Sequence, residues 1–341
     1  MSFRWSLSCL LLVWVAGCNK PAATSSEQPT QPQAAPAAAP EAPAPAAPQL
    51  AVRIGYQKIG APFLLKERSE SLQAALAKHN AKAEWIEFQA GPPILEAIRG
   101  NALDIGYTGE TPPVFAQAGG VPFVYIAREE GAPASEAILV QKDSKLKTVA
   151  DLKGKKIALN RGSNVHYLLL KALESAKLTI KDVTVTYLAP ADARAAFDSK
   201  QVDAWVIWDP FQASAEVAGA RVLRDGQGLV DNNFFYVARR EFAEKNGEIV
   251  GTVLAEFDKL NAWAAKSPED TARILSKSSG IAYEALFKAE GRHVYSIKPI
   301  DEAALAKQQA IADAFFALEL IPQAVKTTAA YLPDAKFGSG S

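Results

Sequence analysis

The chain has 341 residues, of which 22% are charged, and its 37 basic side chains balance 37 acidic ones. Because the charges balance and no basic stripe is present, nucleic acid is not an expected partner. Two cysteines and three histidines are too few and too scattered for a disulfide framework or a transition-metal centre. We therefore expect no metal and no other cofactor.

The first residues predict export from the cytoplasm. A short basic stretch over 1–4 precedes an apolar segment over 5–16, which is too short to span a bilayer as a helix. Small residues then lead directly to Cys18, a pattern that resembles the lipobox of bacterial lipoproteins. The resemblance implies that residues 1–17 are a signal peptide and that Cys18 is lipidated. The alternative is an ordinary secretory peptide followed by an incidental cysteine.

Residues 18–49 are predicted to form a disordered tether, because they are mostly Ala and Pro with almost no large apolar side chain. Such a segment cannot bury enough surface to offset its ordering entropy, and its Ala-Pro repeats favour extended conformations. The tether would keep a folded domain near the membrane and still mobile. Residues 337–341 are predicted to be a flexible tail.

Strand and helix patterns alternate through the folded part of the chain. Strands are expected at 51–55, 83–88, 104–107, 122–127, 137–141, 155–160, 183–188, 203–207, 221–223 and 234–238. Helices are expected at 66–79, 92–99, 111–118, 165–176, on both sides of the strand at 203–207, and throughout the region after Arg239. This alternation predicts an α/β fold with parallel sheets, and the helical end of the chain is expected to pack back on the first lobe.

Three strand-to-helix turns, at 107–113, 160–166 and 208–210, carry polar groups. A helix start presents unpaired N–H groups and a partial positive charge, so each turn is suited to an anion. Gly109 and Gly162 would let ligand oxygens approach the backbone closely. Further donors could come from the side chains of Thr108, Ser163, Asn164 and His166. Alternatively, these side chains only cap their own helices.

The third turn ends a strand that carries two tryptophans, Trp205 and Trp208. Asp209 is well placed as an N-cap, with Pro210 as the first helical residue. Open α/β sheets hold ligands at such strand ends, and large flat side chains suit gripping a small organic molecule rather than reacting with it. Trp205 could instead face the core, because alternate strand residues point to opposite faces.

Together these segments resemble the substrate-binding proteins of bacterial ABC importers for aliphatic sulfonates, in the wider group that also serves nitrate and taurine. The matching segments are 54–58, 88–92, 106–113, 148–154, 162–163 and 190–210. The resemblance implies a bilobal periplasmic binding protein fold of type II, with two parallel-rich sheets flanked by helices and a ligand cleft between the lobes. Lobe 1 would combine 50–137 with 239–336, and lobe 2 would be 138–238.

The resemblance also implies which groups hold the ligand. The first lobe would offer Gln57, Thr108, Gly109 and Glu110, and the second Gly162, Ser163, Asn164, Trp208 and Asp209. A sulfonate stays anionic at physiological pH, so it needs neutral donors rather than a proton acceptor. If the ligand also carried an amine, Glu110 or Asp209 could pair with it.

The expected function is that of a lipid-anchored monomer in the periplasm or at the cell surface. It would close on an aliphatic sulfonate and deliver it to an ABC permease and its ATPase for sulfur uptake. Catalysis is not expected, since Glu110 and Asp209 are explained by helix starts, and His79 and His293 are expected on the solvated surface. The open alternatives are taurine, nitrate or a thiamin precursor as ligand, a ligand sensor, or an enzyme of the related thiamin group.

Overall fold

The computed structural model describes residues 49–333 and residue 337, which belong to one compact unit beginning at Pro48. The predicted signal peptide, Cys18, all but the last residue of the predicted tether and most of the predicted tail lie outside these residues. Within the described part of the chain, no helix combines the length and apolar character needed to cross a membrane.

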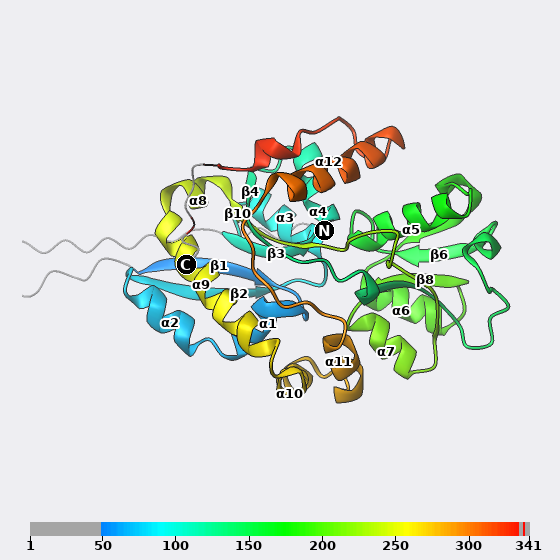
Figure 1. The fold of residues 1–341 in the computed structure, drawn as a ribbon, viewed down its shortest axis with the longest axis horizontal. Helices are drawn as coiled ribbons and strands as arrows, with labels where there is room; N and C mark the ends of the chain where they lie inside the picture. Colours follow the sequence, from blue (N-terminus) through cyan, green and yellow to red (C-terminus); the bar gives the residue numbers. More distant parts are fainter. Residues whose placement is uncertain (1–48, 334–336, 338–341) are drawn as a thin grey trace, which may run out of the picture. The chain divides into compact units, whose positions relative to one another are not determined.

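The first lobe is built on a five-stranded sheet with the order β2-β1-β3-β10-β4 (Figure 1). β1 (Leu50–Tyr56) pairs in parallel with β2 (Ala81–Glu87) and β3 (Ile105–Gly109), as alternating strands and helices predict. β10 (Phe234–Arg239) arrives from much later in the chain and pairs antiparallel with β3 and with β4 (Phe123–Glu129). The sheet is therefore mixed.

The second lobe repeats this plan with the strand order β7-β6-β8-β5-β9. β6 (Lys156–Leu159) pairs in parallel with β7 (Thr184–Tyr187) and β8 (Ala204–Trp208). β5 (Glu136–Val140) pairs antiparallel with β8 and with β9 (Arg221–Asp225). In both sheets the antiparallel strand, β10 or β5, is one that begins just after the chain has crossed from the other lobe.

Helices lie against both sheets. Those before the return to the first lobe are α1 (Gly60–Glu67), α2 (Glu70–Ala77), α3 (Gly91–Arg99), α4 (Thr111–Ala118), α5 (Asn164–Ser175), α6 (Pro190–Asp198) and α7 (Phe211–Val217). The single helix expected over 66–79 is two helices, and the first begins six residues earlier. The first six residues of α1 are all buried, so this segment lacks the polar face by which a surface helix is recognised.

The end of the chain is helical as predicted. It forms α8 (Arg240–Lys245), α9 (Gly247–Ala264), α10 (Pro268–Ser279), α11 (Tyr283–Glu290) and α12 (Glu302–Ala317). α9 packs on α1 and α2, and α12 packs on α4, so both cover the first lobe. α11 packs against α7 of the second lobe, so the return to the first lobe is not complete.

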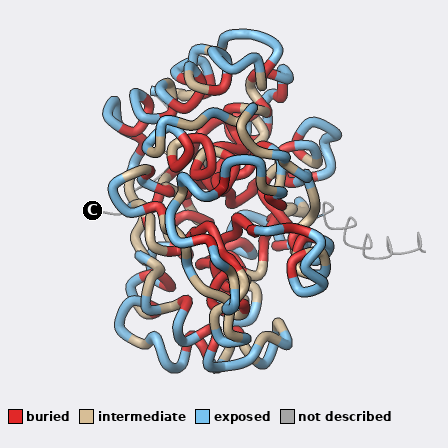
Figure 2. Tube along the Cα trace, turned by 90° about the vertical axis from the view of Figure 1, so that its right-hand side faces the viewer, coloured by how far each residue is buried: buried red, intermediate tan, exposed pale blue. Residues whose placement is uncertain are grey.

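The chain passes from the first sheet to the second between β4 and β5 and returns between β9 and β10. The lobe boundaries expected at 137/138 and 238/239 stay predictions, and sheet membership changes slightly before each of them. Figure 2 shows the buried stretches gathered inside the folded unit and the exposed ones at turns and outer helix faces.

Candidate ligand-binding site

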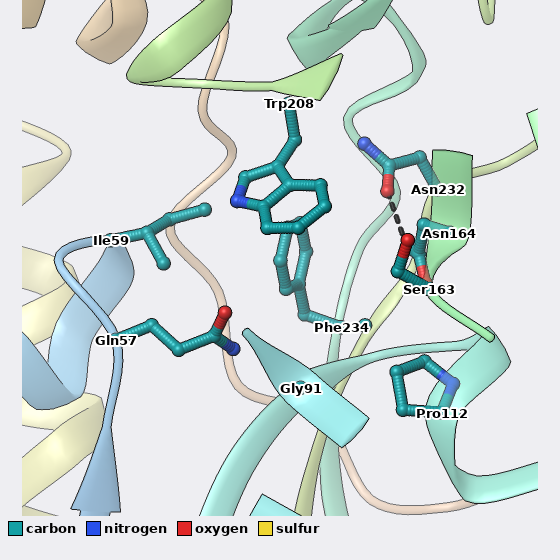
Figure 3. A pocket seen from close by; sticks show the side chains of 10 residues that line it. Gln57, Ile59, Gly91, Pro112, Ser163, Asn164, Trp208, Asn232 and Phe234 are labelled. Carbon is teal, nitrogen blue, oxygen red and sulfur yellow. Dashed lines mark hydrogen bonds between the residues drawn. The ribbon is translucent and has the colours of Figure 1, made fainter. Parts of the chain in front are cut away.

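A cavity of about 330 Å³, part of it open to solvent, lies where strand ends and helix starts of the two lobes face each other (Figure 3). Its ten lining residues are Gln57, Ile59, Gly91, Gly109, Pro112, Ser163, Asn164, Trp208, Asn232 and Phe234. None of these ten side chains is ionisable.

The first-lobe wall is the turn from β3 into α4. Thr111 is the first helical residue, and prolines follow it at 112 and 113. Proline has no N–H, so the first turn of α4 offers one main-chain donor, that of Thr111. This N–H is already bonded to the side-chain oxygen of Asn164, at 3.0 Å. The helix start therefore has fewer free N–H donors than a helix start usually offers.

Two buried threonine hydroxyls belong to this turn, although neither threonine is among the ten lining residues. Thr108 and Thr111 are fully buried, and neither hydroxyl has a hydrogen-bond partner among the described residues. Gly91 packs directly against Thr108 and Pro112, since a Cβ at Gly91 would overlap with the Thr108 hydroxyl and come within 2.8 Å of Pro112 Cγ. An acceptor in the cavity would satisfy buried donors of this kind.

The second-lobe wall is the start of α5. Ser163 precedes the helix in an extended conformation and does not cap it; its hydroxyl donates to the Asn160 carbonyl at 2.7 Å. Because no side chain caps α5, its first N–H groups and the positive end of its dipole remain available to an anion. The anion site that the sequence predicts at this helix start stays a prediction.

Asn164 joins the two walls. Its side-chain oxygen accepts from Thr111 of α4, and its amide nitrogen donates to Asn232 Oδ1 at 2.6 Å (Figure 3). Both hydrogen bonds are buried. A Cβ at Gly109 would overlap with this amide, so the glycine is required for the walls to approach. The Asn164 side chain therefore acts here as a bridge between the lobes.

Apolar side chains line the other end of the cavity. The indole of Trp208 extends from the end of β8 over Phe234, with Ile59 beside it (Figure 3). Trp205 has no part in this wall: it is completely buried and packs on Phe197 with 5.9 Å between ring centroids. The core orientation considered for Trp205 is therefore the one the structure shows.

Besides Trp205, five predicted residues do not line the cavity: Thr108, described above, Glu110, Gly162, His166 and Asp209. The Glu110 carboxylate is buried and accepts from the N–H groups of Asn232 and Asn233, at 3.2 and 2.9 Å, which anchors the returning chain. Burial raises the pKa of Glu110 to about 7, against the lowering effect of these N–H donors. Gly162, with φ of 71°, packs against the Phe115 ring.

His166 is another of the predicted residues that do not line the cavity. It is completely buried among aromatic rings, 5.4 Å from the ring centroid of Tyr187 and 5.2 Å from that of Phe315. Burial, with a smaller contribution from the positive charge of Arg161, lowers the pKa of His166 to about 4. The ring is therefore neutral at physiological pH.

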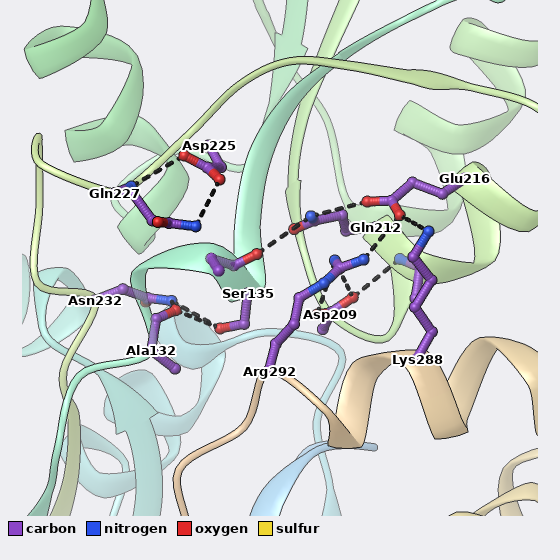
Figure 4. Close-up of polar contacts among 12 residues, drawn as sticks. Ala132, Ser135, Asp209, Gln212, Glu216, Asp225, Gln227, Asn232, Lys288 and Arg292 are labelled. Atoms are coloured by element: carbon purple, nitrogen blue, oxygen red, sulfur yellow. Dashed lines mark hydrogen bonds and ion pairs between the residues drawn. The ribbon is translucent and has the colours of Figure 1, made fainter.

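Asp209 faces a second cavity, which shares Ile59 with the first and whose lining includes Lys58, Asp209, Glu290 and His293. The Asp209 carboxylate pairs with Arg292 at 3.2 Å and accepts from the N–H of Ala213 at 2.9 Å (Figure 4). The predicted N-cap role is wrong by one position, because Pro210 is the N-cap and α7 begins at Phe211. The carboxylate still binds an N–H of the first turn.

His293 was expected on the surface, and this prediction is wrong. Its side chain is 7% exposed, and Nε2 lies 3.5 Å from Glu129 Oε2. The segment after α11 pairs with β4 at Arg128 and Lys298, which carries His293 into the interior although its neighbours in sequence are polar. His79, by contrast, is 30% exposed and contacts Thr252 Oγ1 at 3.1 Å.

Sequence reasoning missed five lining residues: Ile59, Gly91, Pro112, Asn232 and Phe234. Gly91 and Pro112 lie inside segments that carried the family resemblance, and the Thr-Pro-Pro run shows that this helix start is poor in N–H donors. Asn232 and Phe234 reach the cavity only because β10 pairs with β3, and no local pattern indicates that pairing.

Comparison with known proteins gives consistent matches. Residues 52–274 match the family described as the substrate binding domain of ABC-type glycine betaine transport systems. A protein of Escherichia coli strain K12, provisionally named an aliphatic sulfonates-binding protein, is 43% identical over 277 residues, which cover 81% of this chain and 86% of the relative.

Two solved structures are similar along most of their length. The alkanesulfonate-binding protein SsuA of Xanthomonas axonopodis pv. citri, solved with bound MOPS, has a TM-score of 0.80 at 37% identity, covering 84% of this chain and 99% of that one. The periplasmic aliphatic sulphonate binding protein SsuA of Escherichia coli has a TM-score of 0.73 at 43% identity, covering 81% and 90%. Both support the two-lobed fold described above.

Proposed function

The chain belongs to the substrate-binding family of ABC-type transport systems, in its aliphatic-sulfonate-binding group, and on that premise we propose that it captures an aliphatic sulfonate outside the cytoplasm for import. The observation that carries this proposal is a cavity with no ionisable lining side chain, donors at one end and an apolar wall at the other. Such a cavity suits a small molecule with an anionic head and a carbon tail.

The head would lie between the two helix starts. The uncapped start of α5 offers N–H groups, and Thr108 and Thr111 offer buried hydroxyls without partners. A sulfonate accepts hydrogen bonds with three oxygens and donates none, so it can satisfy these donors. Neutral donors avoid the cost of burying a lysine or arginine beside the ligand.

The tail would lie along Trp208, Phe234 and Ile59, where burial of carbon atoms contributes roughly 25 cal/mol per Å². Neither candidate carboxylate is free for an amine on that tail. Glu110 holds the Asn232–Asn233 backbone, and Asp209 pairs with Arg292. We therefore expect plain alkanesulfonates to bind more tightly than taurine.

The remaining parts of the proposal follow the family. The protein would act in the periplasm or at the cell surface, tethered through lipidated Cys18, and would bind and release its ligand without reacting with it. It would pass the ligand to an ABC permease and its ATPase for sulfur uptake, and the tether would raise the local concentration at that partner. The two lobes and the cavity between them fit this clamp-like role.

Calorimetric titration of the full chain in a sulfonate-free buffer tests the proposal. The ligands are ethanesulfonate, butanesulfonate, taurine, sulfate, nitrate and a thiamin precursor. We expect micromolar or tighter binding of an alkanesulfonate, weakened about tenfold or more by Thr108→Val, since a hydrogen bond to a charged group contributes about 1.5–3 kcal/mol.

Thr271→Val is the matched control, because Thr271 is another completely buried threonine without a hydroxyl partner and lies on α10, not in the turn from β3 into α4. It should leave affinity unchanged. Binding of nitrate or the thiamin precursor in place of every sulfonate would overturn the ligand assignment and keep the fold.

A further inference from the structure

Glu136, the first residue of β5, carries a carboxyl group that the proposed site does not yet use. The residue is completely buried, and neither carboxyl oxygen has a hydrogen-bond partner among the described residues. Buried polar groups in native folds nearly always have a partner. A buried carboxyl group left alone in this way therefore points to a partner that the chain itself does not supply.

Strand register places this carboxyl group beside the cavity. Glu136 lies directly opposite Trp208 in the antiparallel β5–β8 pair. Side chains of directly opposed residues project from the same face, with Cβ atoms about 4.5–5.5 Å apart. Because Trp208 lines the cavity, Glu136 lies on the same face of the sheet as this wall, behind the ten lining residues.

The electrostatic neighbour of Glu136 indicates which end of the cavity is involved. Among the ionisable groups described, only Glu110 acts on Glu136 through its charge. Glu110 immediately precedes α4 and binds the backbone of Asn232, whose side chain is bonded to Asn164. Asn232 also donates to the hydroxyl of Ser135, the residue before Glu136, at 3.0 Å. This contact places Glu136 near the end formed by the two helix starts, where the anionic head would lie.

The same surroundings determine the charge of the group. Burial, and then the charge of Glu110, raise the pKa of Glu136 well above its usual range, and no basic group among the described residues opposes this. The side chain is therefore held as the neutral acid near pH 7. A neutral carboxyl group has an O–H to donate, whereas a carboxylate at this place would repel an anion.

We propose that Glu136 is a further ligand-binding residue, which remains protonated and donates its O–H to an oxygen of the bound sulfonate. This inference rests on the proposed function and adds a donor to it. It makes the site selective for an anion that accepts hydrogen bonds through all of its oxygens and donates none. It also makes affinity depend on pH, although the sulfonate itself does not titrate.

Titration of the full chain with ethanesulfonate between pH 6 and pH 9 tests this inference with two variants. The wild type should bind tightly at low pH and more weakly as pH rises through the folded-state pKa of Glu136. Glu136→Gln keeps a neutral donor of similar size and should hold its affinity over the whole range. Glu136→Leu removes the donor and should bind about tenfold more weakly at every pH.

Other ionisable groups lie on or beside the elements packed around β5, namely Glu110 before α4, His166 on α5, Asp209 after β8 and Asp225 on β9. The quantity that tests the inference is therefore the difference in the pH dependence of affinity between the wild type and Glu136→Gln, and not the pH dependence of the wild type alone. Infrared difference spectra give a second readout. Because the pKa of Glu110 is about 7, Glu110 contributes a protonated carboxyl band of its own at neutral pH. The reading is therefore a C=O stretching band that shifts when ethanesulfonate is added to the wild type and is missing from Glu136→Gln.

The outcomes separate this inference from the proposed function. If the wild type binds sulfonates and both variants match it at every pH, Glu136 is not a binding residue and only this inference fails. If Glu136→Gln loses affinity for taurine and keeps it for ethanesulfonate, Glu136 pairs as a carboxylate with an ammonium group, and the neutral donor is wrong. If the wild type binds no sulfonate, the proposed function fails and this inference fails with it.

Discussion

The two cavities that meet at Ile59 differ in the charges around them. None of the residues that line the first is ionisable, whereas the second is lined by Lys58, Asp209, Glu290 and His293 among others. The charged groups of the second cavity are occupied with one another or with neighbours: Arg292 pairs with Asp209, and the Tyr295 hydroxyl donates to Glu290 at 2.7 Å. The first cavity is thus free of ionisable lining groups, while in the second the carboxylates of Asp209 and Glu290 already have partners.

This difference is created by consecutive residues. Trp208 ends β8 and lines the first cavity, while Asp209, the next residue, lines the second. Neighbouring side chains at the end of a strand point in opposite directions, so one strand serves both cavities. A permanently charged ligand is thus offered neutral donors, and the ionised side chains nearby are kept out of its reach.

The largest effect on the first cavity is expected from Gly109→Ala. The new methyl group would overlap with the Asn164 amide and break the bridge between the walls. Overpacking of this kind costs roughly 1–3 kcal/mol, so we expect sulfonate affinity to fall by up to about a hundredfold. Calorimetric titration would measure it. Gly247→Ala is the control, since a Cβ at Gly247 meets nothing within 4 Å. Wild-type affinity in Gly109→Ala would show that the bridge is not needed for binding.

A smaller effect is expected from Trp208→Ala, which removes part of the apolar wall and leaves the donors in place. Affinity for butanesulfonate should fall about tenfold, which corresponds to the burial of roughly 50–60 Å² of apolar surface. Methanesulfonate, which has almost no tail, should lose much less. Titration of both ligands gives the comparison, and equal losses for the two would place the indole against the head instead of the tail.

How far the sequence predicts this site depends on how far apart in the sequence the interacting residues lie. The helix over Thr111–Ala118 and the starts of α4 and α5 follow from local signals, and the structure shows both starts at the cavity. The bridge from Asn164 to Thr111 joins residues 53 positions apart, so nothing near either residue indicates it. The same holds for β10, whose antiparallel place in the first sheet brings Asn232 and Phe234 to the cavity.

Two histidines also show that local sequence does not predict burial. The polar neighbours of His293 predict exposure, but a pairing between the segment after α11 and β4 buries it. His166 follows two predicted ligand residues, yet its position on α5 turns the ring into an aromatic cluster. In both cases the identity of the residue is informative only once the long-range packing is known.

His293 should make the second cavity the source of a pH dependence in stability. Although burial lowers the pKa of His293, the hydrogen bond and charge of Glu129, with the charges of Glu290 and Asp209, raise it overall. Because the folded-state pKa exceeds 6.5, this stabilisation is present below pH 6.5 and is lost as pH rises through the folded-state value.

Urea unfolding of the wild type and His293→Gln between pH 5 and pH 9 measures this contribution. The free energy of unfolding should fall less steeply above pH 6.5 in the variant, by at most about 1.4 kcal/mol per pH unit. His79→Gln, at a partly exposed position, should leave the slope of the wild type unchanged. Equal slopes in all three proteins would mean that His293 does not gain a proton on folding.

The smallest effect on ligand binding is expected from Asp209→Asn, which lies one residue from Trp208. The carboxylate faces the second cavity, and an amide can still accept from the Ala213 N–H. Affinity for both ethanesulfonate and taurine should therefore change by less than about twofold, or roughly 0.4 kcal/mol. Titration of Asp209→Asn with these two ligands measures the change in affinity, and Trp208→Ala, at the neighbouring residue, is the positive control. A selective loss of taurine binding would show that Asp209 reaches the ligand, and the two cavities would then form one site with a charged end.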